Sequence, residues 1–280
     1  MTTTKTKPVS WTRATTIAST LADRYGLERW AQRNTVLGLG LRQDLYALAA
    51  SCTPDDKEEL NRIVDQAQEA AKSRSGANLG TALHRLTERI DSGEILDVPD
   101  QWKPDVDAYC QTLTDKGVKI HEEWIERVVV IPKLMVAGTL DRLVTTNGSG
   151  LKVADLKTGQ HAVNYGAGDI AIQLALYANA SHIWKGTTDE IRRDQYGRYL
   201  LPHPDADPGA YEPMPAVDTS RALVIHLPVG QGECSLHEID IEAGAEAVRL
   251  AMAVRDWRKR KDLASPFKGG FEALTTTDDW

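Results

Sequence analysis

The chain has 280 residues, of which 41% are hydrophobic and 26% are charged, as in an ordinary globular protein of one large or two modest domains. Its longest apolar runs, at 128–131 and 134–137, are far shorter than the roughly 20 residues of a membrane-spanning helix. Residues 1–10 lack the apolar segment of a secretory signal. We therefore expect a cytoplasmic protein with no membrane partner. The net charge of −7 argues against a protein that coats nucleic acids non-specifically.

Two kinds of cofactor site are excluded by the motifs that the sequence lacks. The three cysteines, Cys52, Cys110 and Cys234, lie far apart and form no pair with the spacing of a zinc or iron–sulfur site. A Walker A sequence is also absent. We therefore expect neither an Fe–S cluster nor ATP as a cofactor.

Hydrophobic spacing predicts helices in the first part of the chain and strands in the middle. The predicted helices cover about 11–33, 36–50, 54–72, 80–91 and 102–116. Strands rich in valine and isoleucine follow at 118–120, 126–131, 136–145 and 151–156, with a turn at 147–150. A helix is expected at 170–184, a strand pair at 221–227 and 234–241, and a last helix at 243–262. This order predicts an α/β fold with an N-terminal helical region.

The predicted domain division has three parts. Residues 1–78 form a helical region packed on the core, 79–265 form the core itself, and 266–280 form a tail. The segment 186–220 holds five prolines and is interpreted as an insertion in the core, with a hairpin near 196–197. The basic bias of residues 1–42 predicts that the N-terminal helices form a wall over the functional site.

A catalytic site is indicated most clearly by Asp141, Asp155 and Lys157. Asp155 and Lys157 are two apart on a predicted strand, so their side chains share a face, and the hairpin brings Asp141 beside them. Two carboxylates and a lysine at one point are costly unless a cation compensates, and oxygen ligands suit Mg²⁺ or Mn²⁺. A metal-bound water beside a lysine suits hydrolysis of a phosphodiester. The alternative is a surface Asp–Lys pair on an exposed strand.

The geometry of the hairpin sets a condition on this site. A four-residue loop at 147–150 would place Asp141 opposite Leu156, so that Asp155 and Lys157 would face the other way. The three side chains can therefore converge only if the loop has an odd number of residues or if a bulge lies between the two motifs.

Four motifs occur in order along the chain and together resemble a known nuclease family. They are Gly80-Thr81-Ala82-Leu83-His84, Gly138-Thr139-Leu140-Asp141, Asp155-Leu156-Lys157 and Gln173-Leu174-Ala175-Leu176-Tyr177. This set resembles the RecB-type exonucleases of the PD-(D/E)XK superfamily, in a phage-encoded type close to the CRISPR-associated branch but without its Fe–S cluster.

The resemblance implies a fold, an activity and partners. The fold would be a restriction-endonuclease-like core, a mixed central sheet flanked by helices. The activity would be Mg²⁺- or Mn²⁺-dependent exonuclease cleavage from DNA ends, in phage recombination, repair or replication in the host cytoplasm. The partners would be DNA, single- or double-stranded, and a separate recombinase or helicase.

The resemblance also implies a role for each motif residue. Asp141 and Asp155 would bind the metal with the main-chain carbonyl of Leu156, His84 would complete the metal site, and Lys157 would orient the attacking water. The alternative for His84 is a histidine packed beside an apolar helix stripe. Gln173 and Tyr177 share a helix face and would contact DNA, through phosphate or by stacking of the tyrosine on a base.

An upstream glutamate also belongs to the family pattern. Glu126 fits it best, and Glu122 and Glu123 are rivals. Glu88, one helical turn after His84, could orient the imidazole or be a solvated surface residue.

Two other functions are compatible with the same motifs. One is a structure-selective DNA endonuclease, and the other is a DNA-end-binding recombination module whose nuclease site is vestigial. The intact set of Asp141, Asp155 and Lys157 disfavours the vestigial module.

Overall fold

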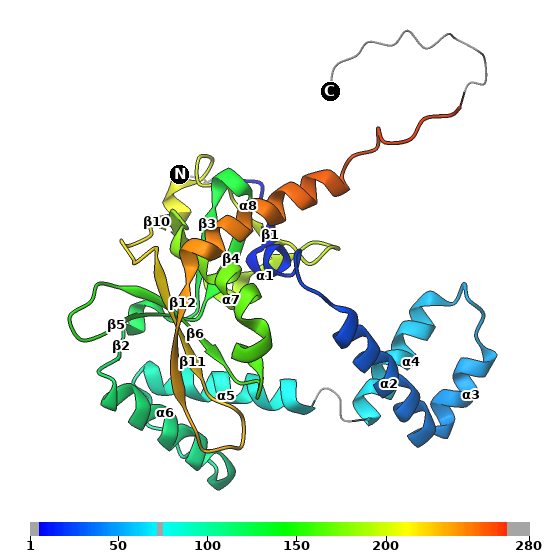
Figure 1. Ribbon diagram of the computed structural model, residues 1–280, viewed down its shortest axis with the longest axis horizontal. Helices are drawn as coiled ribbons and strands as arrows, with labels where there is room; N and C mark the ends of the chain where they lie inside the picture. Colours follow the sequence, from blue (N-terminus) through cyan, green and yellow to red (C-terminus); the bar gives the residue numbers. More distant parts are fainter. Residues whose placement is uncertain (1–5, 72–74, 268–280) are drawn as a thin grey trace, which may run out of the picture.

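The computed structural model describes residues 6–71 and 75–267, which form a seven-stranded and a five-stranded sheet with helices packed around them (Figure 1). The strand order is β10-β7-β3-β4-β1-β9-β8 in the seven-stranded sheet and β12-β11-β6-β5-β2 in the five-stranded sheet. The strands are β1 (Val9–Arg13), β2 (Lys119–Ile120), β3 (Arg127–Ile131), β4 (Val136–Leu140), β5 (Arg142–Thr145), β6 (Lys152–Lys157), β7 (His182–Trp184), β8 (Arg192–Arg193), β9 (Tyr199–Leu201), β10 (Tyr211–Pro213), β11 (Arg221–His226) and β12 (Ser235–Asp240). The helices are α1 (Ala14–Ala18), α2 (Tyr25–Leu41), α3 (Gln43–Ser51), α4 (Lys57–Ala70), α5 (Ser75–Asp91), α6 (Lys103–Asp115), α7 (Ala162–Ala178) and α8 (Ile241–Arg258).

The predicted α/β fold is confirmed, but it contains two sheets in place of the one central sheet that was expected. Both sheets are mixed, because β1 runs parallel to β4 and β6 runs parallel to β11, while the other pairs are antiparallel. The strand expected over 136–145 is interrupted at Asp141, where the chain leaves β4 in one sheet and enters β5 in the other. The break at Asp141 therefore joins the two sheets.

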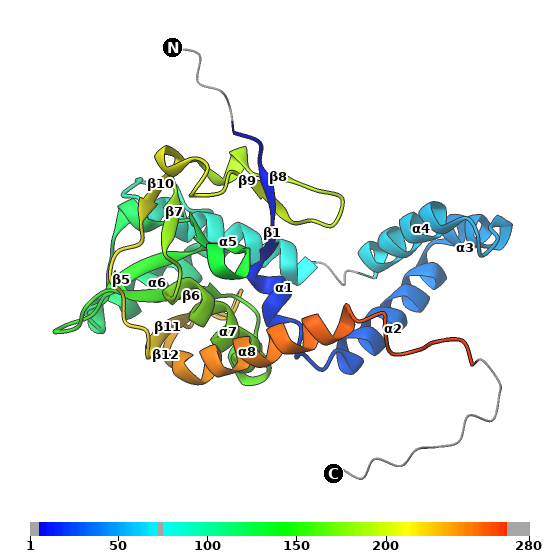
Figure 2. The same cartoon turned by 90° about the horizontal axis from the view of Figure 1, so that it is seen from above.

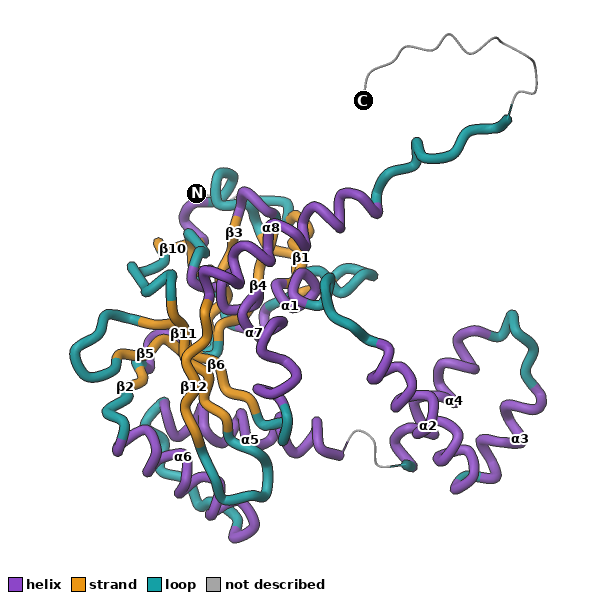
Figure 3. The backbone as a smooth tube through the Cα atoms, in the orientation of Figure 1, coloured by secondary structure: helices purple, strands orange, loops and turns teal. Residues whose placement is uncertain are grey.

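Helices cover both faces of the five-stranded sheet. Val153 of β6 belongs to an apolar cluster with residues of α7, α8 and α1, whereas Leu156 belongs to a second cluster beneath α5 and α6. Successive strand residues point to opposite faces, so β6 packs against both helical layers. Figures 2 and 3 show α7 and α8 side by side along this core. The inner residues of β6 and β11 are accordingly buried on both faces of the sheet.

The helix predicted over 11–33 is wrong. Residues 9–13 form β1, which pairs with β4 and β9 and carries the fully buried Trp11 between two half-buried neighbours. The Trp11 indole nitrogen donates to the Leu201 carbonyl at 3.2 Å. Strand pairing with distant residues here outweighs the local helical spacing. A short α1 follows, and α2 begins at Tyr25.

The helices α2, α3 and α4 pack around a small apolar cluster of their own. Leu45, Ile63 and Ala67 are buried in this cluster. The three helices lie to the side of the two sheets in both views (Figures 1 and 2). Within the N-terminal region, β1 and α1 are thus built into the sheets and their helical layer, and α2–α4 form a separate packing unit.

Two other segments differ from their predictions. The helix expected over 170–184 ends at Ala178, and residues 182–184 form β7. The segment 186–220 contains the expected hairpin, β8–β9, and it also supplies β10 at the edge of the seven-stranded sheet. Of the predicted tail, residues 268–280 lie outside the described residues. No helix within 6–71 or 75–267 is both long and apolar enough to cross a membrane.

Two glycines of α2 allow a matched test of the α2–α4 unit. A Cβ atom at Gly38 would lie 1.8 Å from the Ala67 carbonyl oxygen of α4, whereas a Cβ atom at Gly40 would meet nothing within 4 Å. We predict that Gly38→Ala destabilises the unit by about 1–3 kcal/mol and that Gly40→Ala stabilises it by about 0.5–1 kcal/mol. Amide hydrogen exchange of α2 and α4 measures both. Equal protection in the two variants would contradict this account of the helix crossing.

Candidate active site

The β5–β6 pairing brings the two predicted aspartates together. Its register pairs Arg142 with Ala154 and Val144 with Lys152, so the next facing positions are Asp141 and Asp155. The loop between the strands is therefore odd, and the condition for convergence is met. The alternative register, with Asp141 opposite Leu156, is not adopted.

Asp141 lies at the centre of a set of short contacts from three elements. Its Oδ2 accepts a hydrogen bond from the Leu156 main-chain nitrogen at 2.9 Å. Its main-chain carbonyl accepts one from the Glu126 nitrogen, also at 2.9 Å. The His84 Nδ1 atom on α5 lies 3.9 Å from Asp141 Oδ2. The break between β4 and β5 thus directs this carboxylate toward the end of β6 and toward α5.

Asp155 is the most deeply buried acid of the group. It is 1% exposed, its Oδ2 lies 2.5 Å from Lys157 Nζ, and its Oδ1 accepts a hydrogen bond from Gln173 Nε2 at 3.3 Å. Burial and the neighbouring Asp141 raise the pKa of Asp155 to about 7, although Lys157 acts in the opposite direction. Asp155 Oδ2 accepts no hydrogen bond of good geometry from the described residues. A buried carboxylate left in this state is suited to a cation.

Lys157 is charged, whereas His84 is neutral. Burial alone would lower the pKa of Lys157, but Asp155 and Asp141 outweigh it, so the pKa is raised and the ammonium is retained. Burial lowers the pKa of His84, against the opposing effect of Asp141. His84 is therefore a neutral imidazole at neutral pH, with a nitrogen lone pair available to a metal.

Glu126 is placed beside these residues, and its two rivals are not. Glu122 and Glu123 are exposed, whereas Glu126 lines a cavity of about 560 Å³ with His84 and Glu88 of α5. Burial, Asp141 and Glu88, in that order, raise the pKa of Glu126 to about 8. Its φ of 51° lies in the left-handed region, which a glutamate seldom adopts. Strain of this kind persists where the surrounding structure fixes the residue, and it concentrates at functional sites.

Leu156 contributes its main chain only. Its side chain is fully buried in the cluster beneath α5 and α6, with Leu83 as a neighbour in that cluster. Glu88 is half-buried, and burial raises its pKa. Its place in the same cavity as His84 is compatible with either of the roles considered for it.

Gln173 and Tyr177 of α7 contact each other and the acidic group. Gln173 Nε2 lies 3.1 Å from the Tyr177 hydroxyl and is also the donor to Asp155 Oδ1. Tyr177 is only 2% exposed, so its ring has no free face on which a base could stack. Of the two interactions suggested by the sequence, hydrogen bonding through the hydroxyl is the one that this position allows.

A buried ion pair next to the site was missed by sequence reasoning. Arg142 is 0% exposed, and its Nε donates to Asp91 Oδ2 at 2.6 Å. Its NH2 donates to the Thr87 hydroxyl at 2.8 Å, and its guanidinium lies over the Tyr109 ring, 5.9 Å from the centroid. The Tyr109 hydroxyl donates to both carboxylate oxygens of Asp91. The only signal in the sequence is an arginine directly after Asp141, and nothing there links it to Asp91.

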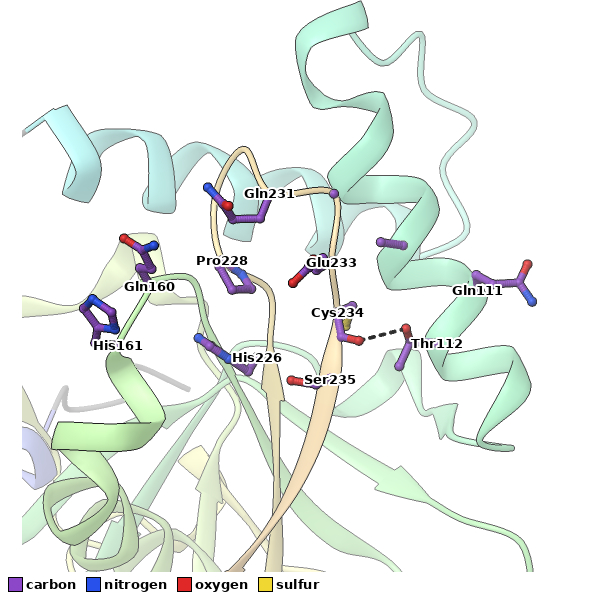
Figure 4. A pocket seen from close by; sticks show the side chains of 12 residues that line it. Gln111, Thr112, Gln160, His161, His226, Pro228, Gln231, Glu233, Cys234 and Ser235 are labelled. Carbon is purple, nitrogen blue, oxygen red and sulfur yellow. Dashed lines mark hydrogen bonds between the residues drawn. The ribbon is translucent and has the colours of Figure 1, made fainter.

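A cavity of about 640 Å³ lies beyond the end of β6. Figure 4 shows Gln160 and His161 on one side of it, and the β11–β12 loop with Gln231 and Glu233 on the other. The buried Asp105 of α6 accepts hydrogen bonds from the main-chain nitrogens of Gly230 and Gly232, which fixes this loop. The cavity contains none of the predicted site residues.

Comparisons with known proteins give no family for the chain: no family model matches it, and a search of curated proteins found no significant match. Among the residues that the structure describes, no three His, Cys, Asp or Glu side chains are placed to hold a metal ion by themselves. A metal at Asp141 and Asp155 would therefore also need main-chain oxygen or water, which Mg²⁺ ordinarily retains.

The raised pKa of Glu126 predicts how stability depends on pH. The folded state holds this proton up to about pH 8, whereas the unfolded chain loses it near the ordinary value of 4.5, so this group lowers the stability as the pH rises between these values. We predict that Glu126→Gln is more stable than the parent protein by about 1–3 kcal/mol at pH 9 and has a shallower pH dependence.

Urea unfolding in EDTA from pH 5 to pH 9 measures this effect. Glu122→Gln, at an exposed position, is the matched control and should follow the parent curve. Parallel curves for Glu126→Gln and the parent protein would show that Glu126 titrates normally.

Proposed function

We propose that the chain is a Mg²⁺- or Mn²⁺-dependent DNA exonuclease with a restriction-endonuclease-like core, acting from DNA ends in phage recombination, repair or replication in the host cytoplasm. The observation that supports it most is the placement of Asp141 opposite Asp155, with Lys157 on Asp155 and His84 beside Asp141. These residues come from three separate elements, α5, the β4–β5 break and β6. Their gathering at one point has no structural purpose that apolar residues would not serve better.

The donor set fits a hard divalent cation. Asp141 and Asp155 supply adjacent carboxylates and the Leu156 carbonyl supplies main-chain oxygen, while the neutral His84 imidazole is near Asp141 but is not placed with both carboxylates to hold an ion. Asp155 Oδ2 is paired with the Lys157 ammonium, so a cation at this site would share the carboxylate with Lys157. When bound, such an ion would act as a Lewis acid on the phosphate and lower the pKa of a water molecule.

The chain's own residues supply the remaining chemistry. Lys157 keeps its charge next to Asp155, where the ammonium can hold the attacking water and stabilise the charge that develops on the phosphate oxygens. Gln173 hydrogen-bonds Asp155 Oδ1 and so holds the carboxylate in one orientation. Glu126 lies near enough to Asp141 for its pKa to respond to it, and because that pKa is raised to about 8 the group holds a proton at neutral pH, so it is a candidate to donate a proton to the leaving oxygen.

DNA as the partner is supported by the basic side of α2. Arg29 and Arg33 are exposed there, and neither forms an ion pair within the described residues. Arg24, directly before α2, acts to lower the pKa of Asp169 of α7 against the larger effect of burial, so its charge lies near this helix of the core. Positive side chains that lead away from the core suit a strand approaching the acidic site. A separate recombinase or helicase would deliver or receive that strand.

Lys157→Ala and Asp155→Asn separate catalysis from metal binding. A protonated lysine has no lone pair for a metal, so Lys157→Ala should bind Mn²⁺ nearly as the parent does, yet lose cleavage by about 10²–10⁴-fold. Asp155→Asn should lose both, because an anionic ligand is removed. Isothermal titration with Mn²⁺ and a gel assay on DNA measure the two effects. Near-normal turnover of Lys157→Ala would refute the role given to this lysine.

End-blocked circular DNA and linear DNA, each with Mg²⁺ and with EDTA, distinguish the function classes. An exonuclease degrades the linear DNA alone and only with Mg²⁺. Cleavage of the circle would indicate a structure-selective endonuclease. Binding to ends without cleavage would indicate a recombination module with a vestigial site.

A further inference from the structure

A second polar pocket lies behind the acidic group, on the side of the seven-stranded sheet. It has a volume of about 150 Å³ and is bordered by β1, α1, β4, β9 and α7. Its polar lining consists of hydrogen-bond donors from these elements: Arg13, Thr15, Thr139, Gln173, Tyr177 and Tyr199. No carboxylate of the described residues lines it. The volume equals about five water molecules in the liquid, which is room for a small hydrated anion.

Arg13 supplies the positive charge of this pocket. It ends β1, where it pairs with Ala137 of β4, so its main chain is fixed inside the sheet. In the part of the chain that the structure describes, no carboxylate forms an ion pair with its guanidinium. The side chain is half-buried. A half-buried guanidinium without a carboxylate partner is suited to an anion such as phosphate.

Gly138 allows Tyr177 to form the floor of the pocket. A Cβ atom at Gly138 would lie 2.5 Å from Tyr177 Cε1 and 3.0 Å from its hydroxyl oxygen. The tyrosine ring therefore crosses β4 in the space that any other residue would fill. Its hydroxyl reaches the pocket, as does that of Tyr199, which lies 3.4 Å from the Thr139 hydroxyl. These three hydroxyl groups can rotate to donate to one anion.

Gln173 connects this pocket to the candidate active site. Its Nε2 lies 3.1 Å from the Tyr177 hydroxyl in the pocket and 3.3 Å from Asp155 Oδ1 in the acidic group. Asp141 and Asp155 also influence the pKa of Tyr177, which burial raises first of all. An anion in the pocket would thus be a near neighbour of a phosphate held at Asp155.

We propose that this pocket binds a second phosphate of the DNA strand, adjacent to the phosphate that is cleaved, with Arg13 as its charged contact. The inference rests on the proposed function for the identity of the strand, and on the pocket's donors for the phosphate. The phosphate can come from two sources, a terminal 5′-phosphate or an internal phosphodiester. In either case it would fix the distance of the strand end from Asp141 and Asp155.

Binding of oligonucleotides by Arg13→Gln tests the proposal. Fluorescence anisotropy in Ca²⁺ compares one labelled single strand with a 5′-phosphate and the same strand with a 5′-hydroxyl. Arg13→Gln should bind about tenfold more weakly, with a salt dependence reduced by about one phosphate contact. Arg13→Lys should recover part of the affinity, because it keeps the charge without the planar fork. Arg249→Gln, an exposed position on α8, is the matched control.

The outcomes separate the two sources and the two proposals. A loss confined to the phosphorylated strand assigns the pocket to a terminal phosphate, and an equal loss on both strands assigns it to an internal one. Unchanged affinity of Arg13→Gln for both strands overturns the proposal. If that variant does not fold, as judged by thermal melting, Thr15→Val and Tyr199→Phe replace it, and unchanged affinity in both overturns the proposal as well.

Failure of the exonuclease would be recognised separately. A protein that binds DNA through Arg13 but cleaves none keeps the phosphate pocket and loses the proposed activity. A protein that degrades linear DNA while Arg13→Gln binds and cleaves like the parent keeps the activity and loses the pocket. A wild-type protein that binds neither strand overturns the pocket, whatever its activity.

Discussion

The buried ion pair between Arg142 and Asp91 is the interaction on which the acidic site depends. Arg142 directly follows Asp141, so any contact that fixes its side chain also fixes the break between the two sheets. The guanidinium ties β5 to α5 through Asp91 and Thr87, and it packs on Tyr109 of α6. Removing one partner of such a pair leaves an uncompensated charge, at a cost of about 3–5 kcal/mol. The pair therefore holds the helix that carries His84 at one position relative to Asp141.

The same guanidinium is a buried positive charge close to a group of acids. It lowers the pKa of Glu88, Glu126 and Asp155, in each case against the larger effect of burial. The acids nevertheless keep raised pKa values, so the compensation within the described residues is incomplete. An unbalanced group of this kind costs stability and is retained where it serves a ligand or a reaction. The left-handed φ of Glu126 adds strain at the same point.

The part of the site that the sequence could predict follows from local geometry. The period of two along a strand places Asp155 and Lys157 on one face, and a tight turn places Asp141 nearby, so two motifs were enough to locate the group. The sequence left one condition open, namely whether the loop has an odd or an even number of residues. One residue more or less in 146–150 would turn the side chains to the opposite face of the strand.

The remainder could not be predicted because it depends on pairings between distant residues. The contact of Arg142 with Asp91 spans 51 positions, and that of Trp11 with Leu201 spans 190. Residues 11–13 were expected to begin a helix, and the pairing with β4 and β9 makes them part of a strand. Arg13 was hidden for the same reason, since its neighbours in the pocket come from β4, β9 and α7.

The break at Asp141 separates two regions of opposite charge. The acids lie where β5 and β6 meet α5, in the five-stranded sheet, and the donors around Arg13 lie where β1 and β4 meet α7, in the seven-stranded sheet. Because opposite charges attract each other, an arrangement that placed Arg13 next to the acids would pair it with them and neutralise both sites. The break keeps them on different sheets, with Gln173 as the neutral contact between them. A polyanion that binds a cation through one phosphate and an arginine through the next could use both sites at once, because the Gln173 side chain contacts both of them.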